Sequence, residues 1–116
     1  MDAGRRSVLV VEDDPSLRLL ARVNLELEQF EVREAGTIED ARAAVEAERP
    51  DVVLLDVHLG GVASDELLEE LRGSGIPVVV VTGTADLEQY RERADDVLGK
   101  PFEPGDLVAA ARRHCV

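Results

Sequence analysis

Short runs of consecutive apolar residues, rich in valine and leucine, recur along the chain at Val8–Val11, Val52–Leu55 and Val78–Val81. Such runs are typical of strands that are buried on both faces of a parallel sheet. Weaker strand patterns at Glu31–Ala35 and Asp96–Gly99 suit the edges of the same sheet. The sequence therefore predicts five strands, of which the three most apolar lie at the centre.

The segments between these strands carry apolar residues at helical spacing. Helix starts are predicted at Asp14, which precedes Pro15, at Thr37, at Ser64 and at Pro104. The expected buried stripes are Leu17, Leu20, Ala21 and Leu25; Ile38, Ala41, Ala44 and Val45; Leu67, Leu68 and Leu71; Leu87, Tyr90 and Ala94; and Leu107, Val108 and Ala111.

Strand and helix thus alternate five times, which predicts an α/β fold with helices on both faces of a parallel sheet. The common doubly wound strand order for five strands is 2-1-3-4-5, as in flavodoxin-like folds. We expect one domain over residues 1–116, since no linker, repeat or low-complexity segment interrupts the pattern.

The composition narrows the class of protein. A net charge of −12 argues against direct binding to nucleic acid, whose phosphates repel an acidic surface. The longest apolar run is far too short to span a membrane. A single cysteine, Cys115, cannot form an internal disulfide, and a cytoplasmic location is expected by default.

Polar side chains follow four of the predicted strands at the point where each strand ends. They are Glu12, Asp13 and Asp14 after the first strand, Asp56 after the third, Thr82 after the fourth and Lys100 after the fifth. In the predicted order these four strands are neighbours, so their carboxyl ends meet in one crevice. Carboxylates attract hard cations such as Mg²⁺, and an aspartate can attack phosphorus. The pattern therefore favours Mg²⁺-dependent phosphoryl transfer to Asp56, with Thr82 and Lys100 neutralising charge on the phosphoryl oxygens.

Simpler explanations exist for some of these residues. Asp14 is best explained as the cap of the first helix, because a cap needs only one acid. Lys100 is the only lysine in a chain whose other basic residues are arginines, which supports a need for a compact point charge. The side chains of His58 and His114 are interpreted as solvated surface groups.

Four segments together resemble the signature blocks of receiver domains from two-component response regulators: VLVVEDDPSLR, DVVLLDVHLGG, VVVVTGT and DDVLGKPFEPGDL. The resemblance covers nearly the whole chain. It implies that a histidine kinase or phosphotransfer protein phosphorylates Asp56, that the chain acts as a conformational switch on an output protein that the sequence does not identify, and that Pro101 follows the lysine through a cis peptide bond.

The same resemblance assigns roles to the other site residues. Asp13 would be a direct Mg²⁺ ligand, Glu12 would act mainly through water, and the backbone carbonyl of His58 would complete the protein ligands together with the phosphoacceptor. Thr82 and Lys100 would contact the phosphoryl oxygens. The chain would catalyse only its own phosphorylation and autodephosphorylation, and would not be an enzyme in the ordinary sense.

The chain departs from the usual receiver pattern in several places. Gly60 replaces a common proline and Gly61–Ser64 lacks the usual Asp-Gly, which should loosen the loop after the phosphoacceptor. Val97 replaces an aromatic switch residue. The stretch from Thr82 to Lys100 is about one helical turn short, so we expect a shortened fourth helix. The chain ends where the fifth helix should end, so we expect no output domain.

Thr84 and His58 lie two residues beyond Thr82 and Asp56, where they are expected to modulate the lifetime of the phosphoryl group. One rival function remains open and another is disfavoured. A degenerate receiver would bind partners without phosphorylation. A flavodoxin-like cofactor protein or an aspartyl phosphatase is disfavoured, because aromatic residues make up 3% of the chain and His58 stands where such a phosphatase has a second aspartate.

Overall fold

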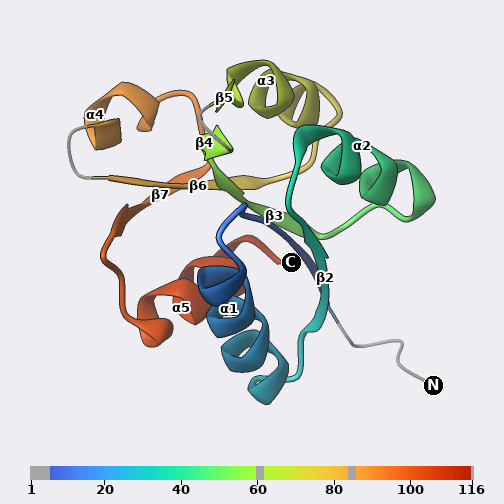
Figure 1. Cartoon of the computed structure of the whole chain (residues 1–116), viewed down its shortest axis with the longest axis vertical. Coiled ribbons are helices and arrows are strands. Elements are labelled where there is room, and N and C mark those ends of the chain that lie inside the picture. The colour runs from blue at the N-terminus through green and yellow to red at the C-terminus, as the bar shows by residue number, and fades with distance from the viewer. Residues whose placement is uncertain (1–5, 60–61, 84–85, 116) are drawn as a thin grey trace.

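The computed structural model describes residues 6–59, 62–83 and 86–115. The strands of its main sheet are β1 (Ser7–Val11), β2 (Glu31–Ala35), β3 (Val52–Asp56), β6 (Val78–Gly83) and β7 (Asp96–Lys100). All neighbouring pairs are parallel and the spatial order is β2-β1-β3-β6-β7, which confirms the predicted order (Figure 1). The two weaker strand patterns form the edges, as expected.

The helices are α1 (Pro15–Leu27), α2 (Ile38–Ala47), α3 (Asp65–Gly73), α4 (Leu87–Tyr90) and α5 (Pro104–His114). Helices α1 and α5 cover one face of the sheet, and α2, α3 and α4 cover the other (Figure 1). None of the described helices is both long and apolar enough to cross a membrane.

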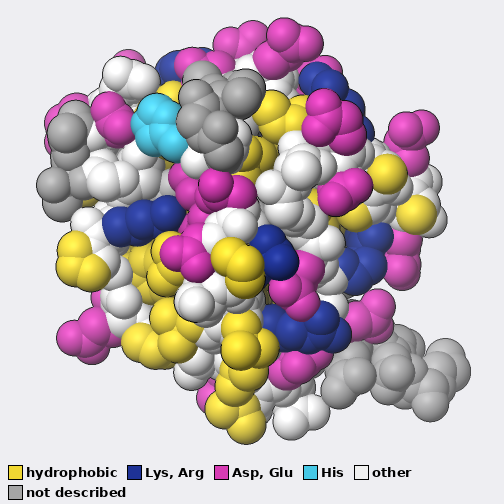
Figure 2. Space-filling view, in the orientation of Figure 1, with side chains coloured by type: hydrophobic (Ala, Val, Ile, Leu, Met, Phe, Trp, Pro, Cys, Tyr) yellow, Lys and Arg dark blue, Asp and Glu magenta, His cyan; other side chains and the backbone are white. Residues whose placement is uncertain are grey.

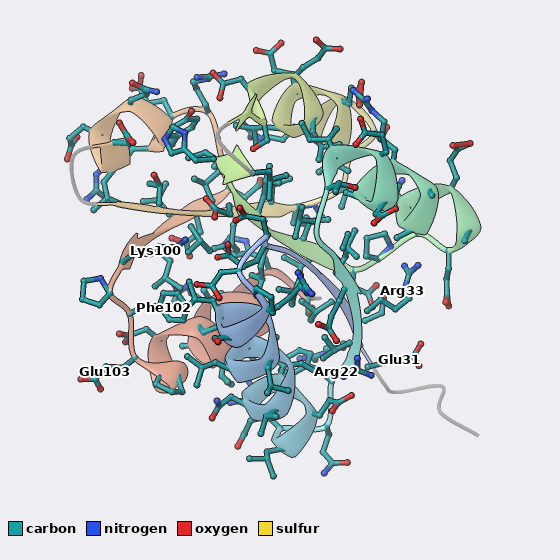
Figure 3. All side chains as sticks on the ribbon, viewed as in Figure 1. Arg22, Glu31, Arg33, Lys100, Phe102 and Glu103 are labelled. Carbon is teal, nitrogen blue, oxygen red and sulfur yellow. The ribbon has the colours of Figure 1, made fainter. Side chains whose placement is uncertain are left out.

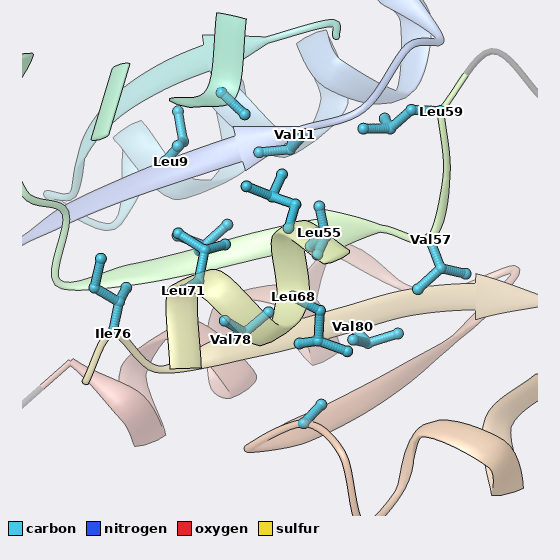
Figure 4. Close-up of a cluster of buried hydrophobic side chains, with 14 of the residues drawn as sticks. Leu9, Val11, Leu55, Val57, Leu59, Leu68, Leu71, Ile76, Val78 and Val80 are labelled. Carbon is cyan, nitrogen blue, oxygen red and sulfur yellow. The ribbon is translucent and has the colours of Figure 1, made fainter. Parts of the chain in front are cut away.

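The central strands supply both hydrophobic cores, because alternate side chains of a strand point to opposite faces. In β3, Leu55 belongs to the core that α2, α3 and α4 cover, and Leu54 belongs to the core under α1 and α5. Figure 4 shows the first core, where Leu68 and Leu71 of α3 pack against the sheet. Burial on both faces explains why β3 has no polar residue before its last position.

Two of the predicted helix caps form as expected. The Asp14 carboxylate accepts a hydrogen bond from the Ser16 amide at 2.8 Å, with proline in the first turn of α1. The Thr37 hydroxyl accepts one from the Asp40 amide at 3.0 Å. Ser64 does precede α3, but its side chain makes no cap hydrogen bond. Ser64 thus occupies the predicted N-cap position, but its fully buried hydroxyl donates to the backbone carbonyl of Asp56 at 2.9 Å and does not cap the helix.

Helix α1 buries a narrower stripe than its sequence predicts. Ala21 and Leu25 are buried, Leu17 is half-buried and Leu20 is 37% exposed. The helix packs on β1, β2 and α5 through the side that carries Ala21 and Leu25, and Leu20 lies largely outside that side. Leu20 was therefore wrongly assigned to the core.

Helix α4 is a single short turn, which confirms the predicted shortening. Leu87 packs on β7 so closely that a Cβ atom added to Gly99 would lie 3.0 Å from its Cδ1 atom. Tyr90 is 2% exposed, and its hydroxyl donates to the Asp65 carboxylate of α3 at 2.6 Å. Ala94 is buried as predicted, although it lies beyond the end of the helix.

The segment after β3 is more regular than the loose loop that was expected. His58–Leu59 (β4) and Val62–Ala63 (β5) form a short antiparallel hairpin. Gly60 and Gly61 lie outside the described residues. The hairpin leads directly into Ser64 and α3.

Candidate functional site

The carboxyl ends of β1, β3, β6 and β7 bring the predicted site residues together. Glu12 follows β1, Asp56 ends β3, Thr82 lies near the end of β6, and Lys100 ends β7. Figure 3 shows Lys100 at the edge of the sheet, with its side chain directed toward the other strand ends. Figure 2 shows acidic side chains gathered at the centre of the same view.

Lys100 bridges the two buried carboxylates of the site. Its Nζ atom lies 3.0 Å from Oε1 of Glu12 and 3.1 Å from Oδ2 of Asp56. Burial lowers the pKa of Lys100, but the hydrogen bonds to Glu12 and Asp56 outweigh that effect and raise the pKa above its usual value. The side chain is therefore an ammonium group at neutral pH, held between two oxygens.

The pKa of Glu12 also rises, but burial and the neighbouring acid are the cause. Burial, followed by the neighbouring Asp56 carboxylate, raises the pKa of Glu12 from 4.5 to about 7, although the hydrogen bond from Lys100 opposes the rise. One ammonium group does not compensate for the desolvation and mutual repulsion of the two acids. The pocket therefore favours an additional cation.

The acidic residues are arranged so that they can share that cation. Carboxylate oxygens of Glu12, Asp13 and Asp56 lie within 4.8 Å of one another, with Asp13 exposed and the other two buried. A set of hard oxygen ligands that is open to water on one side suits Mg²⁺, which keeps several waters and binds through one or two carboxylates. These residues fit the predicted metal.

Thr82 is the buried hydroxyl of the site. The residue is 1% exposed, and its Oγ1 atom has no hydrogen-bond partner among the residues that the structure describes. A buried polar group without a partner typically costs about 1–3 kcal/mol. The hydroxyl lies one strand away from Asp56 and is available to an anion that enters the pocket.

His58 contacts Asp56 through its backbone and Asp86 through its ring. Its amide donates to Oδ1 of Asp56 at 3.0 Å, which orients the carboxylate. Its ring nitrogen Nε2 lies 3.1 Å from the Asp86 carboxylate, so the exposed side chain has a partner that the sequence did not indicate. The metal-binding role of the His58 carbonyl stays a prediction. His114, interpreted from the sequence as a solvated surface group, is instead partly buried and contacts Asp96 at 3.2 Å.

The remaining predicted residues differ in their outcome. The peptide bond between Lys100 and Pro101 is cis, as the resemblance implied. Val97 is half-buried and packs against the core under α3 and α4. Thr84 lies outside the described residues. Sequence reasoning missed Ser64 as a contact of Asp56, and the only signal for it was its place before a helix.

Comparison with known proteins places the chain in a family. The model of the response regulator receiver domain matches residues 8–112. The chain is 39% identical to the DNA-binding response regulator MtrA of Mycolicibacterium smegmatis, over 97% of this chain and 51% of the relative. It is 31% identical to the phosphate regulon transcriptional regulatory protein PhoB of Pseudomonas aeruginosa, over 90% of this chain and 49% of the relative.

A solved structure agrees with these matches. The receiver domain of NtrX from Brucella abortus superposes with a TM-score of 0.86 and 31% identity, covering 93% of this chain and 97% of that domain. The chain spans about half the length of the curated relatives it matches.

Proposed function

The chain belongs to the response regulator receiver family, and from that membership we propose that Asp56 accepts a phosphoryl group in a Mg²⁺-dependent reaction. The donor would be a phosphohistidine of a histidine kinase or phosphotransfer protein. The acidic pocket of Glu12, Asp13 and Asp56 supports this proposal, because receivers use such a pocket as a phosphoacceptor site. The phosphorylated chain would act as a conformational switch on an output partner.

The proposed transfer assigns one task to each residue. A carboxylate oxygen of Asp56 attacks phosphorus, the bond from phosphorus to the donor nitrogen breaks, and the leaving imidazole takes a proton. Lys100 and Thr82 donate to the phosphoryl oxygens, while Glu12 and Asp13 help to hold Mg²⁺. The metal would neutralise charge on the transferred group. The chain would catalyse this step and the later hydrolysis on itself alone.

The contact of Lys100 with both Glu12 and Asp56 carries the proposal. A lysine that already contacts the phosphoacceptor carboxylate is placed to donate to an oxygen of the incoming phosphoryl group. Few structural roles require a partly buried lysine between two acids. The test is intact-mass spectrometry after incubation with a small phosphodonor. We expect the mass of one phosphoryl group to be added in Mg²⁺, but not in chelator and not in Asp56→Asn. Equal addition in chelator or in Asp56→Asn would overturn the assignment.

A degenerate receiver that binds partners without phosphorylation is the second candidate. Val97 in place of an aromatic residue and the single turn of α4 favour it. The same mass measurement separates the two, since a degenerate receiver would gain no phosphoryl group. The name of the MtrA relative includes DNA binding, but this chain matches only about half of that protein, and its own acidity argues against direct contact with nucleic acid.

The lifetime of the phosphoryl group would depend on His58 and Thr84. The His58 ring contacts Asp86 at the start of α4, so it stands beside the site without entering the hydrogen-bond network of Lys100. This placement supports a role in controlling the approach of water. A cytoplasmic location stays a prediction from the sequence.

A further inference from the structure

Both backbone polar groups of Glu12 are hydrogen-bonded, and its carbonyl is part of the peptide that joins Glu12 to Asp13. The Glu12 amide donates to the carbonyl of Ala35 at the end of β2, at 3.0 Å. The Glu12 carbonyl accepts from Nη1 of Arg18 on α1, at 2.9 Å. Glu12 and Asp13 are two of the three acidic residues of the pocket, so the contact on the Glu12 carbonyl helps to orient the peptide that carries both side chains.

Arg18 holds the acidic loop at two points. Its backbone amide donates to the carbonyl of Asp14 at 3.0 Å, and its guanidinium reaches back to Glu12. The loop residue between these two contacts is Asp13. Glu34 of β2 accepts from Nε of Arg18 at 3.1 Å, which orients the guanidinium toward the carbonyl.

Gly36 provides the space that this contact needs. A Cβ atom at position 36 would lie 3.0 Å from Nη1 of Arg18 and 3.9 Å from the Glu12 carbonyl oxygen. The described backbone has positive φ only at Gln29 and Gly75, so Gly36 is not needed for its conformation. A methyl group at Gly36 would therefore displace the tip of a flexible side chain while leaving the backbone unstrained.

We propose that Arg18 is a positioning residue of the metal site, which orients the Glu12–Asp13 peptide so that both carboxylates face the cation, and that Gly36 is required to admit its guanidinium. This inference rests on the proposed Mg²⁺-dependent function. Removing a residue that hydrogen-bonds to a metal ligand and orients it typically weakens metal binding by about 10- to 100-fold. We expect the lower end of that range, because the Ala35 carbonyl continues to hold the Glu12 amide.

A purely structural role would be to fasten α1 to β2. Arg22 on the next turn of α1 already does so, since it also pairs with Glu34. Partly exposed ion pairs of this kind contribute little to stability. The contact that Arg18 adds is the one to the Glu12 carbonyl, and that contact leads to the metal site.

The test compares Arg18→Met, Gly36→Ala and the matched control Arg22→Met. Each protein is titrated with Mg²⁺ alone, and the dissociation constant is taken from backbone amide chemical shifts. Arg18→Met and Gly36→Ala should each bind Mg²⁺ about tenfold more weakly, while Arg22→Met should stay within about twofold of the wild type. Adding Gly36→Ala to Arg18→Met should have no further effect, because both changes remove the same contact.

A second readout separates positioning from folding. The rate of phosphorylation by a small donor should fall in Arg18→Met at low Mg²⁺ and recover when Mg²⁺ is raised. Wild-type affinity in Arg18→Met, or equal losses in Arg18→Met and Arg22→Met, would overturn the inference and leave the proposed function intact. If the wild-type protein bound no Mg²⁺, both would be wrong.

Discussion

Replacing Glu12 by glutamine should stabilise the metal-free protein at neutral and alkaline pH. Burial and the Asp56 carboxylate raise the pKa of Glu12 from 4.5 to about 7, so its charged form is disfavoured in the folded state. Glutamine has nearly the same shape, carries no charge, and can still accept a hydrogen bond from Lys100. The substitution therefore removes the electrostatic penalty and little else.

The size of the effect follows from the pKa difference. A group whose pKa is higher in the folded state binds protons more tightly there, so its contribution to stability is complete below the unfolded pKa. That contribution is lost as the pH rises through the folded pKa. At 1.36 kcal/mol for each pKa unit, a shift from 4.5 to about 7 corresponds to roughly 3 kcal/mol in full. Most of this change should fall between about pH 5 and about pH 8, and it is large beside a net stability of about 5–15 kcal/mol.

Urea unfolding in the presence of chelator provides the assay. The free energy of unfolding of Glu12→Gln, minus that of the wild type, should rise by about 2–3 kcal/mol from about pH 5 to about pH 8. Glu66→Gln is the control, because Glu66 is a surface acid whose side chain is 85% exposed, and it should show no such rise. A pH dependence shared by the wild type and Glu12→Gln would refute the reasoning, since it would place the titrating group elsewhere.

Three further outcomes are expected at the site. Asp13→Asn should weaken Mg²⁺ binding, measured from amide shifts, more than Asp14→Asn, because the second residue caps a helix and asparagine also caps well. Equal losses of Mg²⁺ affinity in the two variants would mean that Asp14 contributes to the metal site as much as Asp13 does. Thr82→Val should leave the unphosphorylated protein as stable, or about 1 kcal/mol more stable in urea unfolding, since the hydroxyl has no partner among the described residues; clear destabilisation would contradict this. With beryllofluoride as a phosphoryl mimic, the largest amide shifts beyond the residues that contact it should lie in Gly60–Leu68 and not in Leu87–Leu98. The reverse pattern would mean that the conformational change spreads through the fourth helix and fifth strand instead.

The sequence could predict the site because the fold carries most of the information. In a parallel sheet the carboxyl ends of neighbouring strands share one edge, so a polar residue that ends a strand has a known location. Asp56 and Lys100 lie 44 positions apart, yet their proximity could be predicted without knowing any side-chain rotamer. Strand identity and strand order were sufficient to place them.

Other contacts could not be predicted, because a long side chain can reach several hydrogen-bond partners and the sequence does not show which one it binds. Nothing in the spacing of Arg18 and Glu12 distinguishes a bond to the carbonyl from an exposed surface arginine. The contact of His58 with Asp86 joins β4 to the start of α4, and the sequence does not show how these two elements lie relative to each other. Leu20 was misplaced for a related reason, because a helical stripe shows which residues could be buried, while the width of the packed face depends on the neighbouring elements.

Hydrogen bonds between Asp56 and its neighbours indicate how a conformational change at the phosphoacceptor would spread to the helices. The Ser64 hydroxyl donates to the backbone carbonyl of Asp56, and the next residue, Asp65, begins α3. Asp65 in turn accepts from the hydroxyl of Tyr90, the buried aromatic residue of α4. Val97 has no such polar link through its side chain and too little surface to remodel a binding face by changing its rotamer. Because a ligand shifts an equilibrium only through its differential interaction with two states, a displacement of Asp56 should reach α3 through Ser64. It should reach α4 through Tyr90 and through the contact of His58 with Asp86.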